Sequence, residues 1–224
     1  MSLNQETSIS SKILLTENRW ADFQKAFDAD AVDPQNSQSD LGLFGQFNRL
    51  MKVTNKSFGL KLAIGGWTYS TYFSNAVRTA SSRNSLANSI VTLFQQWHMF
   101  SGVTIDWEYI TNDGQNFGSS GKTDPPTRPA NVVHPSDAEN FALFVETLRG
   151  MFNQQNWTNY TIAACFTAAP EKMKFDVRRY VPLLDEWHIM TYEYYPLLFL
   201  PFSRPRITRI FLPFLKRHFV HELI

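Results

Sequence analysis

The chain alternates between short stretches with the period of a β-strand and longer stretches with the period of a helix. The clearest strand pattern lies at residues 101–109, because apolar and polar side chains alternate there with a period of two. One face of this predicted strand is β-branched and aromatic, and the other carries two acids. The apolar side chains are Val103, Ile105, Trp107 and Tyr109, and the polar ones are Thr104, Asp106 and Glu108.

The two acids, Asp106 and Glu108, are the most informative part of this pattern. A buried carboxylate costs several kcal/mol unless it is paired or hydrogen-bonded. A strand face that carries two of them therefore usually lines a polar cavity or an active site. An edge strand with its polar side in water is the alternative that the pattern leaves open.

Three helices and three further strands are predicted from the same two periods. The helices begin near Asp40, Asn84 and Ser136; Asp40 is a predicted N-cap, and Ser136 with Glu139 forms a predicted capping box. Because strands and helices alternate, the sequence predicts an α/β fold with a parallel sheet. The further strands are expected at residues 60–64, 160–167 and 187–192, and a shorter helical piece at 173–184.

The composition narrows the classes of partner. The 224 residues suffice for one domain with a sizeable core, and a net charge of +1 gives no reason to expect nucleic acid or an anionic membrane as a partner. The aromatic content is 15%, with 6 tryptophans, which fits a protein that stacks aromatic rings on a neutral ligand such as a sugar. The same content fits a large core equally well.

Cysteine and histidine give little sign of other chemistry. Cys165 is the single cysteine, so the sequence has no internal disulfide, and we expect this residue in the core. His98, His134 and His188 lack the spacing of metal ligands, and no phosphate-binding loop is present. The sequence therefore predicts neither a metal site nor a cofactor.

Changes in composition predict three regions. Residues 1–39 are mostly polar and lack a sustained period, so they form a poorly defined N-terminal segment, and we expect no signal peptide there. Residues 40–195 hold the predicted elements, with a long Gly- and Pro-rich loop at 111–135 of a kind that tends to be functional. Residues 196–224 form an atypical basic and aromatic tail, whose prolines and arginines argue against a membrane span. The cellular compartment stays open.

Four short motifs within residues 40–195 point to a known family. Residues 63–67, 101–108, 168–173 and 190–193 follow one another in the chain. Together they resemble the family-18 glycoside hydrolases, the chitinase family. Residues 63–67 resemble the Ser-x-Gly-Gly signature on the third barrel strand, and residues 101–108 the Asp-x-x-Asp-x-Asp-x-Glu signature on the fourth. Residues 168–173 resemble the segment after the fifth strand, and residues 190–193 the Met-x-Tyr-Asp signature on the sixth.

This resemblance implies a TIM barrel of which strands three to six are recognisable, with the site at the carboxyl ends of the strands. It implies hydrolysis of β-1,4-linked N-acetylglucosamine with retention, the acetamido oxygen of the substrate acting as nucleophile. Glu108 would act as acid and then as base, and Asp106 would raise the pKa of Glu108 and orient the acetamido group. Tyr192 would hydrogen-bond the acetamido carbonyl. The implied partner is chitin or its oligosaccharides.

Further residues are expected to contact the sugar. Trp67 is either a platform for a sugar ring or a core residue, and Tyr192 could also be a core aromatic. The glycines at 65 and 66 serve backbone geometry more readily than ligand contact, because glycine permits unusual φ angles. The candidate substrate-binding residues are Trp67, Gly66, Tyr109, Met190, Glu193 and Thr104, with Glu193 standing where the family has aspartate.

The sequence also departs from the family pattern. Ser101 and Thr104 stand where the family usually has two aspartates. Because a threonine cannot take a proton from Asp106, we expect a shifted pH profile and a reduced rate. About half of the barrel strands are not recognisable, so two alternatives stay open: a non-catalytic carbohydrate-binding protein, and an inactive truncated fragment.

Overall fold

The computed structural model describes residues 2–3, 13–14, 19–27, 32, 41–55, 58–67, 69–110, 130–169 and 172–191. Helices and parallel strands alternate along most of this part of the chain, as the sequence predicts. The main elements are β3 (Leu60–Gly65), α3 (Phe73–Val77), α4 (Ala80–Gln96), β4 (Phe100–Asp106), α5 (Asp137–Gln154), β5 (Thr161–Thr167), the 3-10 helix η4 (Val177–Tyr180) and β6 (Glu186–Met190).

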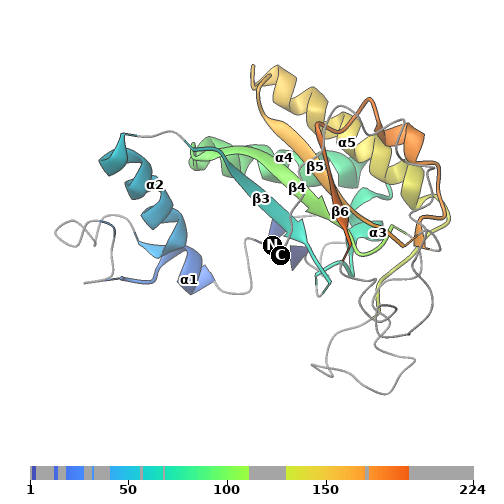
Figure 1. Ribbon diagram of the computed structural model, residues 1–224, viewed down its shortest axis with the longest axis horizontal. Coiled ribbons are helices and arrows are strands. Elements are labelled where there is room, and N and C mark those ends of the chain that lie inside the picture. Colours follow the sequence, from blue (N-terminus) through green and yellow to red (C-terminus); the bar gives the residue numbers. More distant parts are fainter. Residues whose placement is uncertain are drawn as a thin grey trace, which may run out of the picture.

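The four strands β3, β4, β5 and β6 form one parallel sheet in the order of the sequence. Figure 1 shows them side by side, with α4 and α5 against the sheet. All four strands therefore end at the same edge, and the segments that follow them meet there. The prediction of an α/β fold with a parallel sheet is confirmed. No helix in the described ranges is long and apolar enough to cross a membrane.

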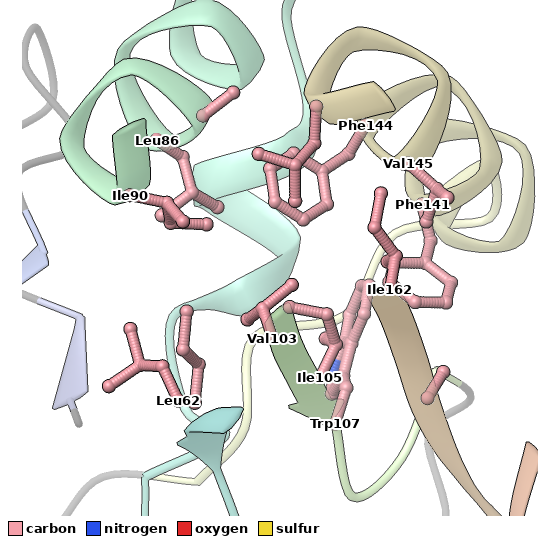
Figure 2. Packing of buried hydrophobic residues seen from close by; sticks show 14 of the residues in the cluster. Leu62, Leu86, Ile90, Val103, Ile105, Trp107, Phe141, Phe144, Val145 and Ile162 are labelled. Atoms are coloured by element: carbon pink, nitrogen blue, oxygen red, sulfur yellow. The ribbon is translucent and has the colours of Figure 1, made fainter. Parts of the chain in front are cut away.

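The sheet has one apolar face, which the helices cover. Figure 2 shows strand residues such as Val103 and Ile105 pointing toward α4 and α5. Both of these side chains are fully buried, as are Ile90 of α4 and Phe144 of α5. This face holds the hydrophobic core, to which burial of apolar area contributes most of the stabilisation. We call it the apolar face; its strand residues are Leu62, Ile64, Val103, Ile105, Ile162 and Ala164.

The alternate side chains form a second face, which we call the polar face. The registers of β3 with β4 and of β5 with β6 place these residues side by side. Ala63, in the middle of β3, is exposed, whereas its apolar-face neighbours Leu62 and Ile64 are buried. The strand residues of the polar face are Lys61, Ala63, Thr104, Asp106, Ala163, Cys165, Glu186 and His188.

Helix α4 begins four residues before the predicted start. Its N-terminus is fixed by a capping box in which the Thr79 hydroxyl accepts a hydrogen bond from the Ser82 amide and the Ser82 hydroxyl accepts one from the Thr79 amide. The prediction missed this start because residues 80–85 are polar and show no apolar period. The residues expected on its apolar side, Leu86, Ile90 and Phe94, are in the core.

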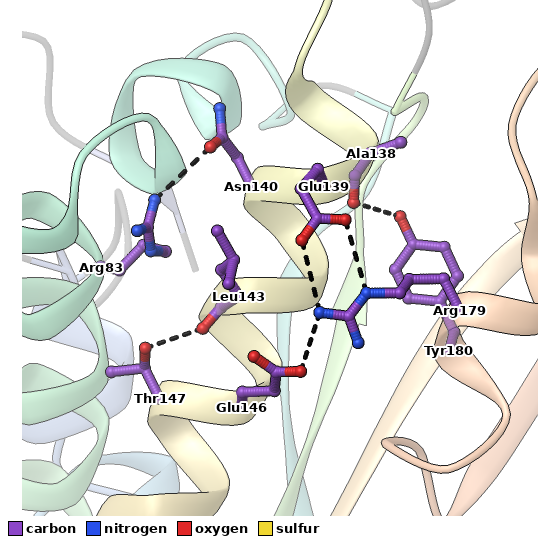
Figure 3. Close-up of polar contacts among 9 residues, drawn as sticks. All are labelled: Arg83, Ala138, Glu139, Asn140, Leu143, Glu146, Thr147, Arg179 and Tyr180. Carbon is purple, nitrogen blue, oxygen red and sulfur yellow. Dashed lines mark hydrogen bonds and ion pairs between the residues drawn. The ribbon is translucent and has the colours of Figure 1, made fainter.

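The predicted capping box of α5 is wrong. Ser136 occupies the N-cap position but makes no side-chain cap hydrogen bond. Glu139 instead pairs with Arg179, which also binds Glu146, as Figure 3 shows. The opposite charge of a guanidinium draws the carboxylate away from the helix terminus. These contacts, with the hydrogen bond from the Tyr180 hydroxyl to the Ala138 carbonyl, attach η4 to α5. The predicted helical piece at 173–184 is this shorter 3-10 turn.

The N-terminal part holds more structure than the sequence pattern indicates. Residues 1–39 include the paired two-residue strands β1 (Ser2–Leu3) and β2 (Ile13–Leu14) and the helix α1 (Arg19–Phe23). Helix α2 (Gly42–Thr54) follows, with Leu41 rather than Asp40 at its N-cap. Phe23 packs on Phe44 and Trp97, with ring centroids 4.8 and 5.9 Å away. The sequence did not reveal these short elements, because they have no sustained period and depend on contacts distant in sequence.

Candidate active site

The strand that carries the acids ends at Asp106, earlier than the alternation predicts. Trp107 still points to the core, where it stacks on Phe73 with a centroid separation of 5.2 Å. Tyr109, predicted on the same face, leaves it: the ring lies 6.3 Å from that of Trp67 and beneath the Lys172 ammonium at 4.7 Å. The chain thus turns after Trp107, so the alternation of apolar and polar residues does not predict the positions of the Glu108 and Tyr109 side chains.

Ser70 fixes this turn, although nothing in the sequence pattern singled it out. Its side chain is fully buried, and its hydroxyl lies 2.8 Å from the Gly66 carbonyl oxygen and 3.3 Å from that of Asp106. The Ser70 hydroxyl oxygen also accepts a hydrogen bond of 2.9 Å from the Glu108 amide. One hydroxyl therefore connects the ends of β3 and β4 to the backbone of Glu108.

Asn131 holds Glu108 from the other side. Its side-chain amide donates a hydrogen bond of 2.7 Å to the Glu108 carbonyl oxygen. The next residue, Val132, donates its own amide to the Thr71 carbonyl. The Glu108 side chain is buried, with 6% of its area exposed. This glutamate is therefore a buried acid on a backbone held at both its N–H and its C=O.

Asp106 lies beside the glycines that end β3. The Gly66 amide donates a hydrogen bond of 2.7 Å to the Asp106 carbonyl oxygen. Gly65 and Gly66 have φ angles of 108° and 83°, which favour glycine, and a Cβ at Gly66 would lie 3.7 Å from Oδ2 of Asp106. The prediction that these glycines serve backbone geometry fits both angles.

The Asp106 carboxylate is in an unusual electrostatic environment. Burial raises its pKa, while a hydrogen bond with the Cys165 thiol and the charge of His188 act to lower it. Its Oδ1 atom is buried and has no hydrogen-bond partner among the described residues. The prediction that Cys165 belongs to the core is wrong, because this half-buried thiol lies on the polar face. Along β5, Cys165 alternates with the apolar-face residues Ile162 and Ala164, so its side chain lies on the polar face.

His188 is also part of this face. Its Nε2 atom lies 3.3 Å from Oε2 of Glu186, which forms an ion pair with Lys61 across the sheet. Burial acts to raise the pKa of Glu186, but the hydrogen bonds and charges of Lys61 and His188 outweigh it, so that the pKa is lowered. A row of charges thus leads from β3 to β6. The sequence pattern around His188 gave no sign of this contact.

The remaining predicted residues divide into three groups. Thr104 is buried on the polar face, one layer below Asp106, with 8% of its area exposed. Met190, also buried, ends β6 opposite Thr167. Trp67 is 45% exposed, so the reading of it as a core residue is wrong. Tyr192 and Glu193 lie outside the described residues.

A second buried acid, Asp137, connects the segments that follow β3 and precede α5. Asp137, at the first turn of α5, accepts hydrogen bonds of 2.9 Å from the Ser74 hydroxyl and 2.7 Å from the His134 amide. Burial raises its pKa against these two hydrogen bonds. It ties α3 to the segment that carries Asn131.

Within the part of the chain that the structure describes, no three His, Cys, Asp or Glu side chains form a group that could hold a metal ion.

Comparison with known proteins decides the family. The family described as glycosyl hydrolases family 18 matches residues 14–206. The chain belongs to this family. Chitinase A1 of Niallia circulans is 26% identical over 196 residues, which are 85% of this chain and 25% of that protein. Endochitinase 1 of Metarhizium robertsii is 38% identical over 100 residues, which are 43% of this chain and 22% of that protein.

Solved structures show the same fold. Chitinase ChiA74 from Bacillus thuringiensis matches 85% of this chain and 29% of its own, with a TM-score of 0.65 and 24% identity. The catalytic domain of the psychrophilic chitinase B from Arthrobacter TAD20 matches 84% of this chain and 49% of its own, with a TM-score of 0.65 and 23% identity. The prediction of a TIM-barrel-type fold, present in part, is confirmed. The chain spans about a quarter of the length of the two curated relatives.

Proposed function

We propose that this chain is a chitinase-like glycoside hydrolase that cleaves β-1,4 linkages between N-acetylglucosamine units, with Glu108 as acid and base. The observation that carries this proposal is the position of Glu108. It is a buried acid directly beyond the carboxyl end of β4, with its backbone held by Ser70 and Asn131. A proton donor has to be held in one position relative to the bond that it cleaves, and these contacts supply that restraint.

The proposed reaction has two steps. First, Glu108 protonates the glycosidic oxygen while the acetamido oxygen of the substrate attacks the anomeric carbon, so that the glycosidic bond breaks and an oxazolinium ion forms. Then Glu108, now a carboxylate, takes a proton from water as the water oxygen attacks the same carbon and opens the ring. Two attacks on one carbon give retention of configuration. The substrate supplies the nucleophile, so one acid is sufficient for proton transfer.

Asp106 has the second role. In its ionised form it orients the acetamido group and stabilises the positive charge that develops on it. Gly66 supports this role, because the absence of a side chain leaves the neighbourhood of Oδ2 of Asp106 open on that side. Tyr192, Met190, Glu193 and Thr104 remain proposed contacts of the substrate. The proposed roles of all these residues come from the family pattern in the sequence.

A binding function without catalysis is the second candidate, and one observation favours it. Trp67 is 45% exposed, and its ring meets that of Tyr109 at an interplanar angle of 67°. An exposed aromatic ring of this kind offers a flat apolar surface to a sugar ring. An inactive fragment is the third reading.

The test is the release of a fluorophore from chitobiose and chitotriose glycosides by the purified chain and by Glu108→Gln. We expect turnover in the parent chain and a loss of at least about a hundredfold in the variant, which keeps the shape of the side chain but not its proton. Glu139→Gln, a change at a glutamate bound to Arg179 on the surface of α5, is the matched control and should keep full activity.

The three readings give different outcomes. Turnover that Glu108→Gln removes supports the hydrolase. Binding of chitotriose by calorimetry without turnover, weakened by Trp67→Ala, supports the binding function. Neither turnover nor binding, together with a broad thermal transition, supports the inactive fragment and contradicts the proposed function.

A further inference from the structure

The surroundings of Asp106 differ from the pattern of the family motif. Thr104, two residues earlier on the same face, stands where the motif has a carboxyl that could share a proton with Asp106. Its hydroxyl is confined, because only 8% of Thr104 is exposed. A hydroxyl can donate a hydrogen bond but cannot hold the shared proton between two carboxyl groups. The charge of Asp106 therefore has to be controlled by other residues.

Cys165 is one of these residues. It lies on β5, and the registers of β4 with β5 place it on the same face and at the same level as Asp106. Its thiol and the Asp106 carboxylate form a hydrogen bond, which favours the ionised acid. This bond opposes the effect of burial, which favours the neutral acid.

His188 is the register partner of Cys165 on β6. When its imidazole is protonated, its charge also favours the ionised form of Asp106. Glu186 lies 3.3 Å from His188, and Lys61 pairs with Glu186. These are the charged or titratable groups that the described strands carry on this face: Lys61 from β3, Asp106 from β4, Cys165 from β5, and Glu186 and His188 from β6. Glu108 follows β4 two residues beyond Asp106.

We propose that Cys165 and His188 are positioning residues that hold Asp106 ionised and oriented, in place of a second carboxyl on β4. The thiol donates the hydrogen bond that fixes the carboxylate, and the His188 ring, which contacts Glu186, acts on it through its charge. The effect on catalysis rests on the proposed function, whereas the coupling of the three side chains does not.

The first experiment measures this coupling without catalysis. Cys165 is the only cysteine in the chain, so the rate of alkylation by iodoacetamide reports on one thiol. In Asp106→Asn we expect this rate at neutral pH to rise by roughly three- to tenfold, because a neighbouring carboxylate disfavours the thiolate and its removal lowers the thiol pKa. In His188→Gln the rate should fall, because the coulombic effect of His188 on this pair of side chains is lost.

Asp176→Asn is the matched control for Asp106→Asn. Asp176 is an exposed aspartate bound to Arg178 at the start of η4, so its replacement should leave the alkylation rate unchanged. An Asp106→Asn rate within twofold of the parent, with native circular dichroism, would overturn the proposal. The same rise in both aspartate variants would also overturn it, since that would be a general effect of net charge.

The second experiment follows the consequence for the reaction. Loss of the thiol donor in Cys165→Ala raises the pKa of Asp106, so the acid limb of the kcat/KM profile should move to higher pH. Cys165→Ser keeps a donor and should restore part of the shift. If the parent chain cleaves substrate and the limb of Cys165→Ala does not move, the catalytic part of the proposal is wrong. If the parent chain cleaves nothing, the proposed function fails, and the alkylation rates alone decide the coupling.

Discussion

The two faces of the sheet are built from alternate residues of the same four strands, but they differ in almost every physical respect. On the apolar face, Val103 and Ile105 are fully buried against helices. On the polar face, Thr104 and Asp106 lie among a thiol, an imidazole and an ion pair. Residues one position apart therefore serve the core and the site in turn.

The comparison teaches that stability and chemistry are separated across the sheet. Apolar area buried on one face stabilises the fold by about 25 cal/mol per Å². Groups on the other face carry a cost, since burial disfavours the charge of Asp106. Substitutions on the apolar face should therefore change stability, and those on the polar face mainly charge and reactivity.

The strongest test of this separation compares Ile105→Ala with Thr104→Ala, at adjacent positions of β4. Ile105 is 1% exposed in the core, so its truncation should lower the free energy of unfolding by about 2–5 kcal/mol. The change at Thr104 should cost about 1 kcal/mol. Urea unfolding followed by circular dichroism measures both. Equal losses would mean that the two faces do not differ in energetic weight.

Ser70→Ala tests the turn that joins the faces. The change leaves the buried Glu108 amide without its acceptor, which should cost about 1–3 kcal/mol in the free energy of unfolding. Ser89→Ala is the control, because that partly buried hydroxyl only donates to the Ser85 carbonyl within α4. A loss at Ser70 no larger than that at Ser89 would contradict the role of Ser70 in fixing the turn.

Gly66→Ala tests the backbone beside Asp106. With φ at 83°, a side chain at this position should destabilise the fold by about 1–2 kcal/mol. At Gly150 in α5 a Cβ meets nothing within 4 Å, so Gly150→Ala should instead stabilise by about 0.5–1 kcal/mol. Thermal unfolding of the two variants should therefore shift in opposite directions, and a shift of Gly66→Ala to higher temperature would exclude strain at this glycine.

Asp106→Asn should give the smallest effect, and one that depends on pH. Because burial raises the pKa of Asp106, the folded chain binds the proton more tightly than the unfolded chain does. Stability of the parent therefore falls as pH rises from the ordinary aspartate pKa toward the raised one. The variant lacks this loss, so its Tm should exceed that of the parent at neutral pH and approach it in acid. A difference in Tm that is constant with pH would contradict the charged state assigned to Asp106.

Local patterns predicted the strands and the layer of helices, but not the capping interactions at the helix termini. The period of two at β4 and the period near four at Leu86, Ile90 and Phe94 are properties of the sequence itself. The start of α5 at Ser136 was predicted correctly, but its capping box was wrong because Arg179, distant in the sequence, pairs with Glu139. The prediction for Cys165 was wrong, and that for His188, as a structural or solvent-exposed residue, gave no contact with the site. A single thiol or imidazole carries no period that shows which face it occupies.

The sequence by itself determined that strands and helices alternate, that β4 has one apolar and one polar side, and that its motif belongs to a family of glycoside hydrolases. These features follow from local periodicity and from the order of residues in short segments. Only the tertiary structure decided that Ser70 and Asn131 hold Glu108, and that Cys165 and His188 meet Asp106. The contacts of Cys165 and His188 depend on the register of neighbouring strands, and those of Ser70 and Asn131 on loops that the fold brings together from distant parts of the chain.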